Sequence, residues 1–144
     1  MDRVLDSIRV HLSPHRSVTF SQLMDAWSRH LARLEQEAEL PIVDDRWGAH
    51  DFFAALSLRD ALEHALEALP RSQAQVARDE LAARDAVLRQ FTEEDGAHLV
   101  RRFGERSTGN WWWDRVPISG LVREELAAWA SAVGRSFAPD VDRD

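Results

Sequence analysis

Apolar residues recur along much of this chain at spacings of three and four, the period that places side chains on one face of an α-helix. The clearest such stretch runs from residue 20 to about residue 38. Its apolar positions are Phe20, Leu23, Met24, Trp27, Leu31 and Leu34. Thr19 or Ser21 can cap this helix. Pro41 should end it, because the residue before a proline disfavours the helical conformation.

Weaker periodicity, together with capping residues and prolines, predicts the other elements. Helices are expected from Val4 to Leu12, over 58–69 with Ser57 and Asp60 as a capping pair, from Ser72 to Phe91, over 99–103 and from Ser119 to Gly134. A short helical turn is expected at Phe52–Leu56, and an interruption or kink at 92–96. Residues 41–51 and 104–119 are expected to form irregular loops.

These elements predict an all-α fold, a compact helical bundle of five to six helices with little or no sheet. A chain of 144 residues has the length of one domain. We expect residues 1–137 to form that domain and the acidic tail 138–144 to be disordered. The chain has no cysteine, which excludes a disulfide framework, a thiol nucleophile and a thiolate metal site.

The net charge and hydropathy of the chain exclude some classes of binding partner. The formal net charge is −7 and the isoelectric point is near 5.3, so the basic surface typical of nucleic-acid binding is absent. No apolar run approaches the roughly 20 residues of a membrane span. The first residues carry acids and lack an apolar signal core. We therefore expect no nucleic-acid or membrane binding, and a cytoplasmic location.

Negative charge is concentrated between Glu35 and Asp51, where six acidic residues accompany a single base, Arg46. Such a run is most often a solvated surface. An acidic surface that carries an aromatic side chain also suits docking onto a basic protein, because charge complementarity accelerates association. The candidate partner-binding residues in this segment are Asp44, Asp45, Trp47 and Asp51.

The same segment offers an alternative, a small enzyme. The side chains of Asp44, Asp45, His50 and Asp51 could hold a divalent cation or act as acid and base. Their spacing matches no recognised metal-binding loop, and the oxygen-ligand rhythm of a calcium loop is missing. We therefore expect no metal, no cofactor and no catalytic residues.

Three consecutive tryptophans, Trp111, Trp112 and Trp113, are the least ordinary feature of the chain. Successive side chains point about 100° apart on a helix and to opposite faces on a strand. One buried face therefore cannot take all three: either the segment is covered on both sides, or at least one indole is exposed. Tryptophan and arginine are enriched among residues that dominate binding energy. The triplet and Arg115 are therefore further candidate partner-binding residues.

These features favour a small acidic protein-binding module. The best hypothesis is an inhibitor or immunity-type, antitoxin-like protein that occludes a basic partner, either a toxin or an enzyme. A regulatory or scaffold helical module and the small enzyme described above are the alternatives.

Overall fold

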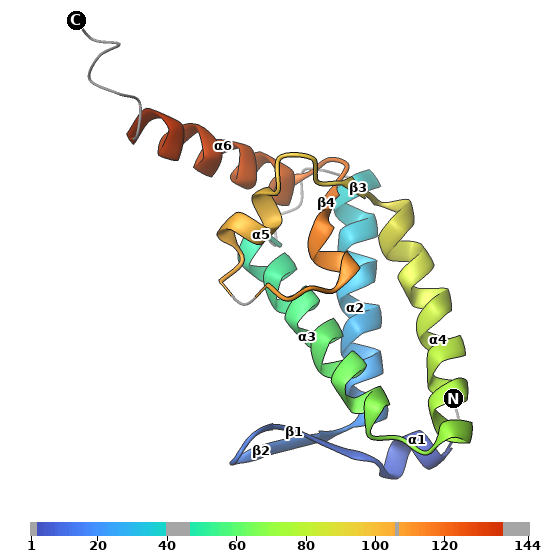
Figure 1. Cartoon of the computed structure of the whole chain (residues 1–144). Coiled ribbons are helices and arrows are strands. Elements are labelled where there is room, and N and C mark those ends of the chain that lie inside the picture. The colour runs from blue at the N-terminus through green and yellow to red at the C-terminus, as the bar shows by residue number, and fades with distance from the viewer. Residues whose placement is uncertain (1–2, 40–46, 106, 137–144) are drawn as a thin grey trace, which may run out of the picture.

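The computed structural model describes residues 3–39, 47–105 and 107–136. Within these residues the chain forms a helical bundle with two small antiparallel sheets (Figure 1), which confirms the predicted helical fold. The elements in chain order are α1 (Arg3–Ser7), β1 (Arg9–Ser13), β2 (Arg16–Thr19), α2 (Phe20–Glu39), α3 (Ala49–Glu67), α4 (Arg71–Gln90), β3 (Thr92–Glu94), α5 (Leu99–Phe103), the 3₁₀ helix η1 (Trp111–Asp114), β4 (Arg115–Pro117) and α6 (Leu121–Ser136).

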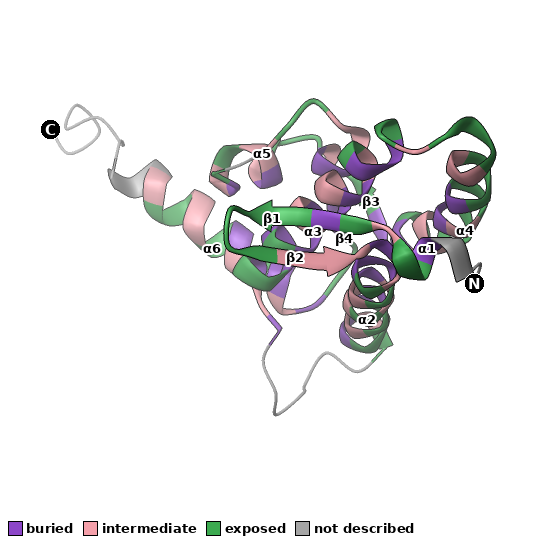
Figure 2. Cartoon of the chain, turned by 90° about the horizontal axis from the view of Figure 1, so that it is seen from below, coloured by how far each residue is buried: buried purple, intermediate pink, exposed green. Residues whose placement is uncertain are grey.

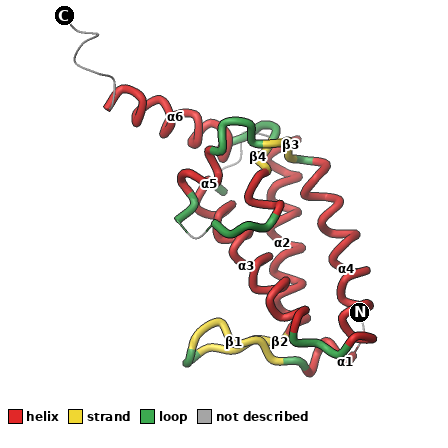
Figure 3. Tube along the Cα trace, in the orientation of Figure 1, coloured by secondary structure: helices red, strands yellow, loops and turns green. Residues whose placement is uncertain are grey.

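The three long helices α2, α3 and α4 pack against one another and form the body of the molecule (Figure 1). At one end of this body lie α5, η1 and the β3–β4 sheet, and α6 starts there and extends away. The β1–β2 hairpin projects from the opposite end. Figure 3 shows that short helical and strand segments follow one another after α4. None of the described helices combines the length and the apolar character needed to cross a membrane.

Helix α2 supplies the centre of the hydrophobic core. All six of its predicted apolar positions are buried, and Trp27 is 1% exposed. Thr19 caps the helix as predicted: its Oγ1 accepts the Gln22 N–H at 3.1 Å, and Gln22 Oε1 accepts the Thr19 N–H at 2.8 Å. This reciprocal pair satisfies two backbone donors that a helix start leaves free.

The predicted first helix is wrong beyond residue 7. Residues 9–13 form strand β1, which pairs with β2 in an antiparallel hairpin around Pro14. Val10 lies opposite Val18, and the burial of Val10 anchors the hairpin to the body (Figure 2). Helical spacing over so few residues is weak evidence, because alternate apolar positions such as 8, 10 and 12 fit a strand equally well.

Helix α3 begins at Ala49 and includes the predicted turn Phe52–Leu56, so residues 49–51 are helical and not part of an irregular loop. The predicted capping pair is wrong, because Ser57 and Asp60 lie inside this helix. Two carboxylates hold this start. Asp51 Oδ2 accepts the Gly48 N–H at 2.8 Å, and Glu125 Oε1 of α6 accepts the Ala49 N–H at 2.8 Å. The helix ends at Glu67, before Pro70 as predicted. Residues 40–46 lie outside the described residues.

Later elements also depart from the predicted boundaries. Helix α4 begins at Arg71, directly after Pro70, and needs no cap from Ser72. The expected interruption after it is strand β3, which pairs with β4, so the predicted loop 104–119 contains both a 3₁₀ turn and a strand. Gly134 does not end α6, which continues to Ser136. The predicted tail 138–144 lies outside the described residues.

Candidate functional site

The structure separates the candidate residues that the sequence singled out. Asp44 and Asp45 lie outside the described residues. Trp47 is only 7% exposed and belongs to the core, where its ring meets Phe52 edge-on with centroids 6.1 Å apart. Asp51 is exposed at the start of α3, and its carboxylate accepts the Gly48 N–H. Residues 49–51 of the acidic segment therefore form the start of α3, which follows the buried indole of Trp47.

The Trp47 indole is held by a neutral histidine. Its Nε1–H donates to His30 Nδ1 at 3.3 Å. Burial lowers the pKa of His30 below its usual value. The positive charge of Arg29 lowers this pKa further, whereas the negative charge of Asp51 raises it. The imidazole is therefore unprotonated at neutral pH, which leaves Nδ1 free to accept.

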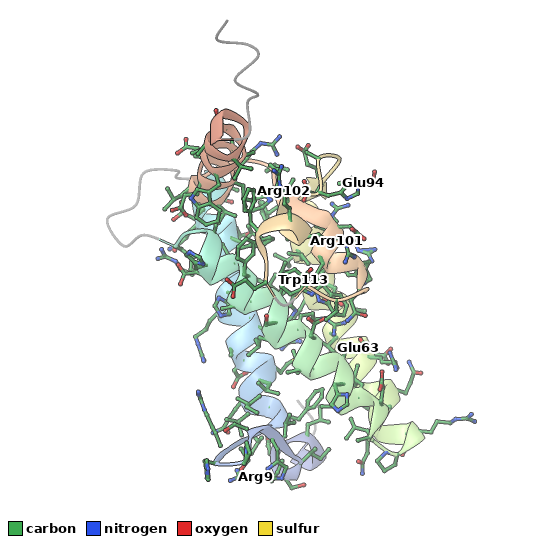
Figure 4. All side chains as sticks on the ribbon, turned by 60° about the vertical axis from the view of Figure 1, so that its left-hand side comes forward. Arg9, Glu63, Glu94, Arg101, Arg102 and Trp113 are labelled. Carbon is green, nitrogen blue, oxygen red and sulfur yellow. The ribbon has the colours of Figure 1, made fainter. Side chains whose placement is uncertain are left out.

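The tryptophan triplet is mostly interior. Trp112 is 2% exposed and Trp113 is fully buried, whereas Trp111 is half-buried. Figure 4 shows Trp113 near the middle of the molecule. The tight 3₁₀ turn of η1 sends successive side chains in different directions. Two indoles enter the core, and Trp111 is left as the accessible member.

One carboxylate, Asp60 of α3, receives both buried indoles. Its Oδ2 accepts Trp113 Nε1–H at 2.8 Å, and its Oδ1 accepts Trp112 Nε1–H at 3.0 Å. The same Oδ1 also accepts Asn110 Nδ2–H at 2.7 Å and Thr108 Oγ1–H at 2.9 Å. Asp60 therefore ties η1, and the residues just before it, to helix α3.

An ion pair between Arg101 and Asp114 also holds the same segment. Arg101 of α5 donates to Asp114 Oδ2 at 3.0 Å and to the backbone oxygens of Thr108 and Asn110. The guanidinium hydrogen bond lowers the pKa of Asp114 below its usual value. The carboxylate of Asp114 is therefore already paired with a cation, Arg101.

Trp111 faces a pocket of about 430 Å³, which we call the Trp111 pocket. It lies where the end of α4, the β3–α5 connection, η1 and β4 come together. Its lining residues are Arg89, Glu94, Asp95, Gly96, His98, Trp111, Asp114 and Arg115. The structure thus brings together two of the predicted candidates, Trp111 and Arg115, in one concave site.

A second concave site was not predicted from the sequence. His50 and Phe53 of α3, Phe103 of α5 and Trp129 of α6 form a continuous ring cluster, with centroid separations of 5.3 to 6.4 Å. A hollow of about 210 Å³ adjoins the cluster, lined by His50, Phe53, Ala54, Ser57, Phe103, Glu105 and Trp113. We call the cluster and its hollow the aromatic groove. His50 is exposed, and Phe103 and Trp129 are half-buried.

Of the four residues of the enzyme alternative, the structure describes His50 and Asp51, whereas Asp44 and Asp45 lie outside the described residues. His50 faces Trp129 at 5.3 Å, whereas the carboxylate of its neighbour Asp51 turns to the Gly48 N–H. Over residues 3–39, 47–105 and 107–136, no three histidine, aspartate or glutamate side chains form a group suited to a metal ion.

No protein-family model, curated protein or solved structure matches this chain. Two of its concave sites, the Trp111 pocket and the aromatic groove, and its negative charge bear on its function.

Proposed function

We propose that this chain is a protein-binding module, an inhibitor or immunity-type protein that occludes a basic partner, and that the aromatic groove is its anchor point. The observation that carries the proposal is the ring cluster itself. Rings from three separate helices meet at the surface, and Phe103 and Trp129 remain half-buried while His50 is exposed.

A surface of this kind suits a protein partner. Tryptophan is among the residues that most often dominate binding energy, and such anchors work best beside a pocket that a partner's side chain can fill. The hollow between Phe53, Ser57 and Phe103 provides that pocket. The interaction would bury apolar ring surface that the free chain leaves in contact with water.

The sign of the partner's charge follows from the acids around the groove. Asp51, next to His50 on α3, and Glu105, which lines the hollow, are both exposed, and the whole chain carries −7. Arg102 on α5 is an exposed base in this region, with its guanidinium 5.4 Å from the Phe103 ring centroid. Acids predominate, which supports a basic partner and faster association at low salt.

The first experiment locates the partner on the surface. A photoreactive amino acid replaces Ala54, an exposed residue that lines the hollow, and in a separate control it replaces Ala83, an exposed alanine on α4. We expect a basic protein to cross-link from position 54 and not from position 83. Equal cross-linking from both positions would contradict the proposal.

The second experiment uses that partner in purified form. We expect Trp129→Ala to weaken binding by about 30-fold or more, the effect of a hot-spot residue. Val76→Ala, at an exposed valine on α4, should leave affinity unchanged. Binding should weaken as salt rises, and the partner's own activity should fall when the complex forms. An affinity insensitive to Trp129→Ala, in a variant whose melting temperature is unchanged, would refute the role of the groove.

A further inference from the structure

The Trp111 pocket contains two arginine side chains whose charge no described carboxylate neutralises. Arg115 donates from Nε to Thr92 Oγ1 at 3.0 Å, and from Nη2 to the backbone oxygens of Thr92 at 2.7 Å and Arg89 at 3.1 Å. All three acceptors are uncharged. Within the described part of the chain, its Nη1 has no hydrogen-bond partner.

Arg89 is the second cation. Its guanidinium lies over the Trp111 ring, with Cζ 3.8 Å from the centroid, and among the described residues it has no acidic partner. Contact with an aromatic face steadies a guanidinium while leaving the N–H groups at its edge able to bind an anion in a two-pronged manner. Both arginines are thus held in place by contacts that leave donors unused.

Three carboxylates line the same pocket, and two of them are engaged elsewhere. Asp95 is buried, and its Oδ2 accepts the Val100 N–H at 2.7 Å. Asp114 is paired with Arg101. Glu94 remains, exposed at the upper end of the molecule in Figure 4. It lies directly opposite Arg115 in the β3–β4 ladder, a position at which side chains share one face, and yet the two form no ion pair.

We propose that the Trp111 pocket binds a small ligand that carries a carboxylate or phosphate on a planar ring. Arg89 and Arg115 would hold the anionic group, and the half-buried Trp111 would contact the ring. The volume of about 430 Å³ falls within the roughly 300–1,000 Å³ of small-molecule sites, so the pocket has room for a ring beside the anionic group. This site is separate from the aromatic groove and does not depend on the proposed function.

The binding test compares four probes that share one ring. Benzoate and phenyl phosphate carry the two anionic groups, benzyl alcohol is neutral and benzamidine is cationic. Titrations at millimolar concentration, followed by intrinsic tryptophan fluorescence and by calorimetry, should show saturable binding of one or both anions. Whichever anion binds more tightly identifies the preferred group. Absence of saturable binding for both, or equal binding of benzamidine, would overturn the proposal.

Charge-neutralising variants then test the assigned residues. Arg89→Gln should weaken anion binding by about tenfold, and Arg71→Gln, at the opposite end of α4, should not. Glu94→Gln should tighten binding severalfold because it removes a nearby like charge. Its control is Glu93→Gln, whose carboxylate is paired with Arg123. Weaker anion binding in Glu94→Gln would contradict the predicted repulsion by Glu94 and would refute the proposal.

A substitution that adds an uncharged side chain to the pocket tests the proposal without changing any charge. A Cβ at Gly96 would meet no atom within 4 Å, and the backbone there does not require glycine. Gly96→Leu should therefore fold with an unchanged melting temperature and lose anion binding. Unchanged binding in this variant would place the ligand elsewhere.

Discussion

Asp60 explains how three consecutive tryptophans can be ordered in so small a domain. Its carboxylate accepts two buried indole N–H groups, and it also accepts bonds from Asn110 and Thr108. Arg59, the preceding residue, lies over the Trp112 ring with Cζ 4.2 Å from the centroid. A buried indole without an acceptor is costly, so the geometry of η1 depends on one residue that precedes the two indoles by 52 and 53 positions.

Asp60→Ala should therefore destabilise the protein by roughly 3 kcal/mol, because two buried donors lose their acceptor. The free energy of unfolding in urea measures the effect. Glu67→Ala, at an exposed acid on the same helix, should change it by less than about 0.5 kcal/mol. Equal effects in the two variants would show that Asp60 is not the anchor of η1.

At the scale of elements, the helices stabilise one another's starts with carboxylates from a different helix. Glu125 of α6 accepts the Ala49 N–H at the start of α3. Buried Glu37 of α2 in turn accepts the backbone N–H of Leu121 at the start of α6. Burial raises the pKa of Glu37 above its usual value, although Arg33 and the Leu121 N–H act in the opposite direction. Free N–H groups at helix starts favour such negative charge.

Glu125→Ala should cost about 1 kcal/mol, the usual effect of losing an N-terminal cap. Thermal unfolding followed by circular dichroism would show the loss as a lower melting temperature. The control is Glu35→Ala, since Glu35 is an exposed acid in the last part of α2, away from that helix's start. A control that melts as early as Glu125→Ala would argue against cross-helix capping.

The strongest periodicity predicted its element best. Helix α2 has a continuous apolar face and a Thr19–Gln22 cap, both local features that a sequence displays. The β3–β4 sheet joins residues 92–94 to residues 115–117, and no local pattern reveals such a pairing. Hairpin β1–β2 was missed because a few apolar residues fit either period.

The candidate sites divide in the same way. Trp111 and Arg115 stood out by residue type, and the structure places them in one pocket. The aromatic groove combines His50, Phe103 and Trp129 from three distant segments. Only tertiary packing brings these rings together, and each one alone resembles an ordinary core or surface residue.

At the scale of the whole molecule, a polar network connects the three long helices. Arg59 of α3 is 4% exposed and donates to both oxygens of Asp85 of α4, at 3.0 and 2.9 Å. It also donates to Glu63 at 3.1 Å. Trp27 of α2 donates its indole N–H to Asp85 at 3.3 Å. The ion pair between Arg59 of α3 and Asp85 of α4 thus also binds a side chain of α2, so it joins all three long helices.

Asp85→Ala should destabilise the protein by about 3 to 5 kcal/mol, because it leaves the buried Arg59 without its main partner. Asp79→Ala, at an exposed acid on the same helix, is the control and should have little effect on urea unfolding. Arg59→Met combined with Asp85→Leu should recover a large part of the loss, since an apolar pair can replace a buried ion pair. A double variant no more stable than Asp85→Ala would contradict this account.

The six tryptophans fall into two groups by what their indole nitrogens do. Those of Trp27, Trp47, Trp112 and Trp113 donate to interior acceptors. In the part of the chain that the structure describes, Trp111 and Trp129 make ring contacts and no indole hydrogen bond. Hydrogen exchange of the first four protons requires the bundle to open, whereas the other two can exchange from the folded state. In one ¹⁵N-labelled sample, exchange of the first four indole protons therefore reports global unfolding. The Trp111 and Trp129 indole signals report separately on binding at the Trp111 pocket and at the aromatic groove.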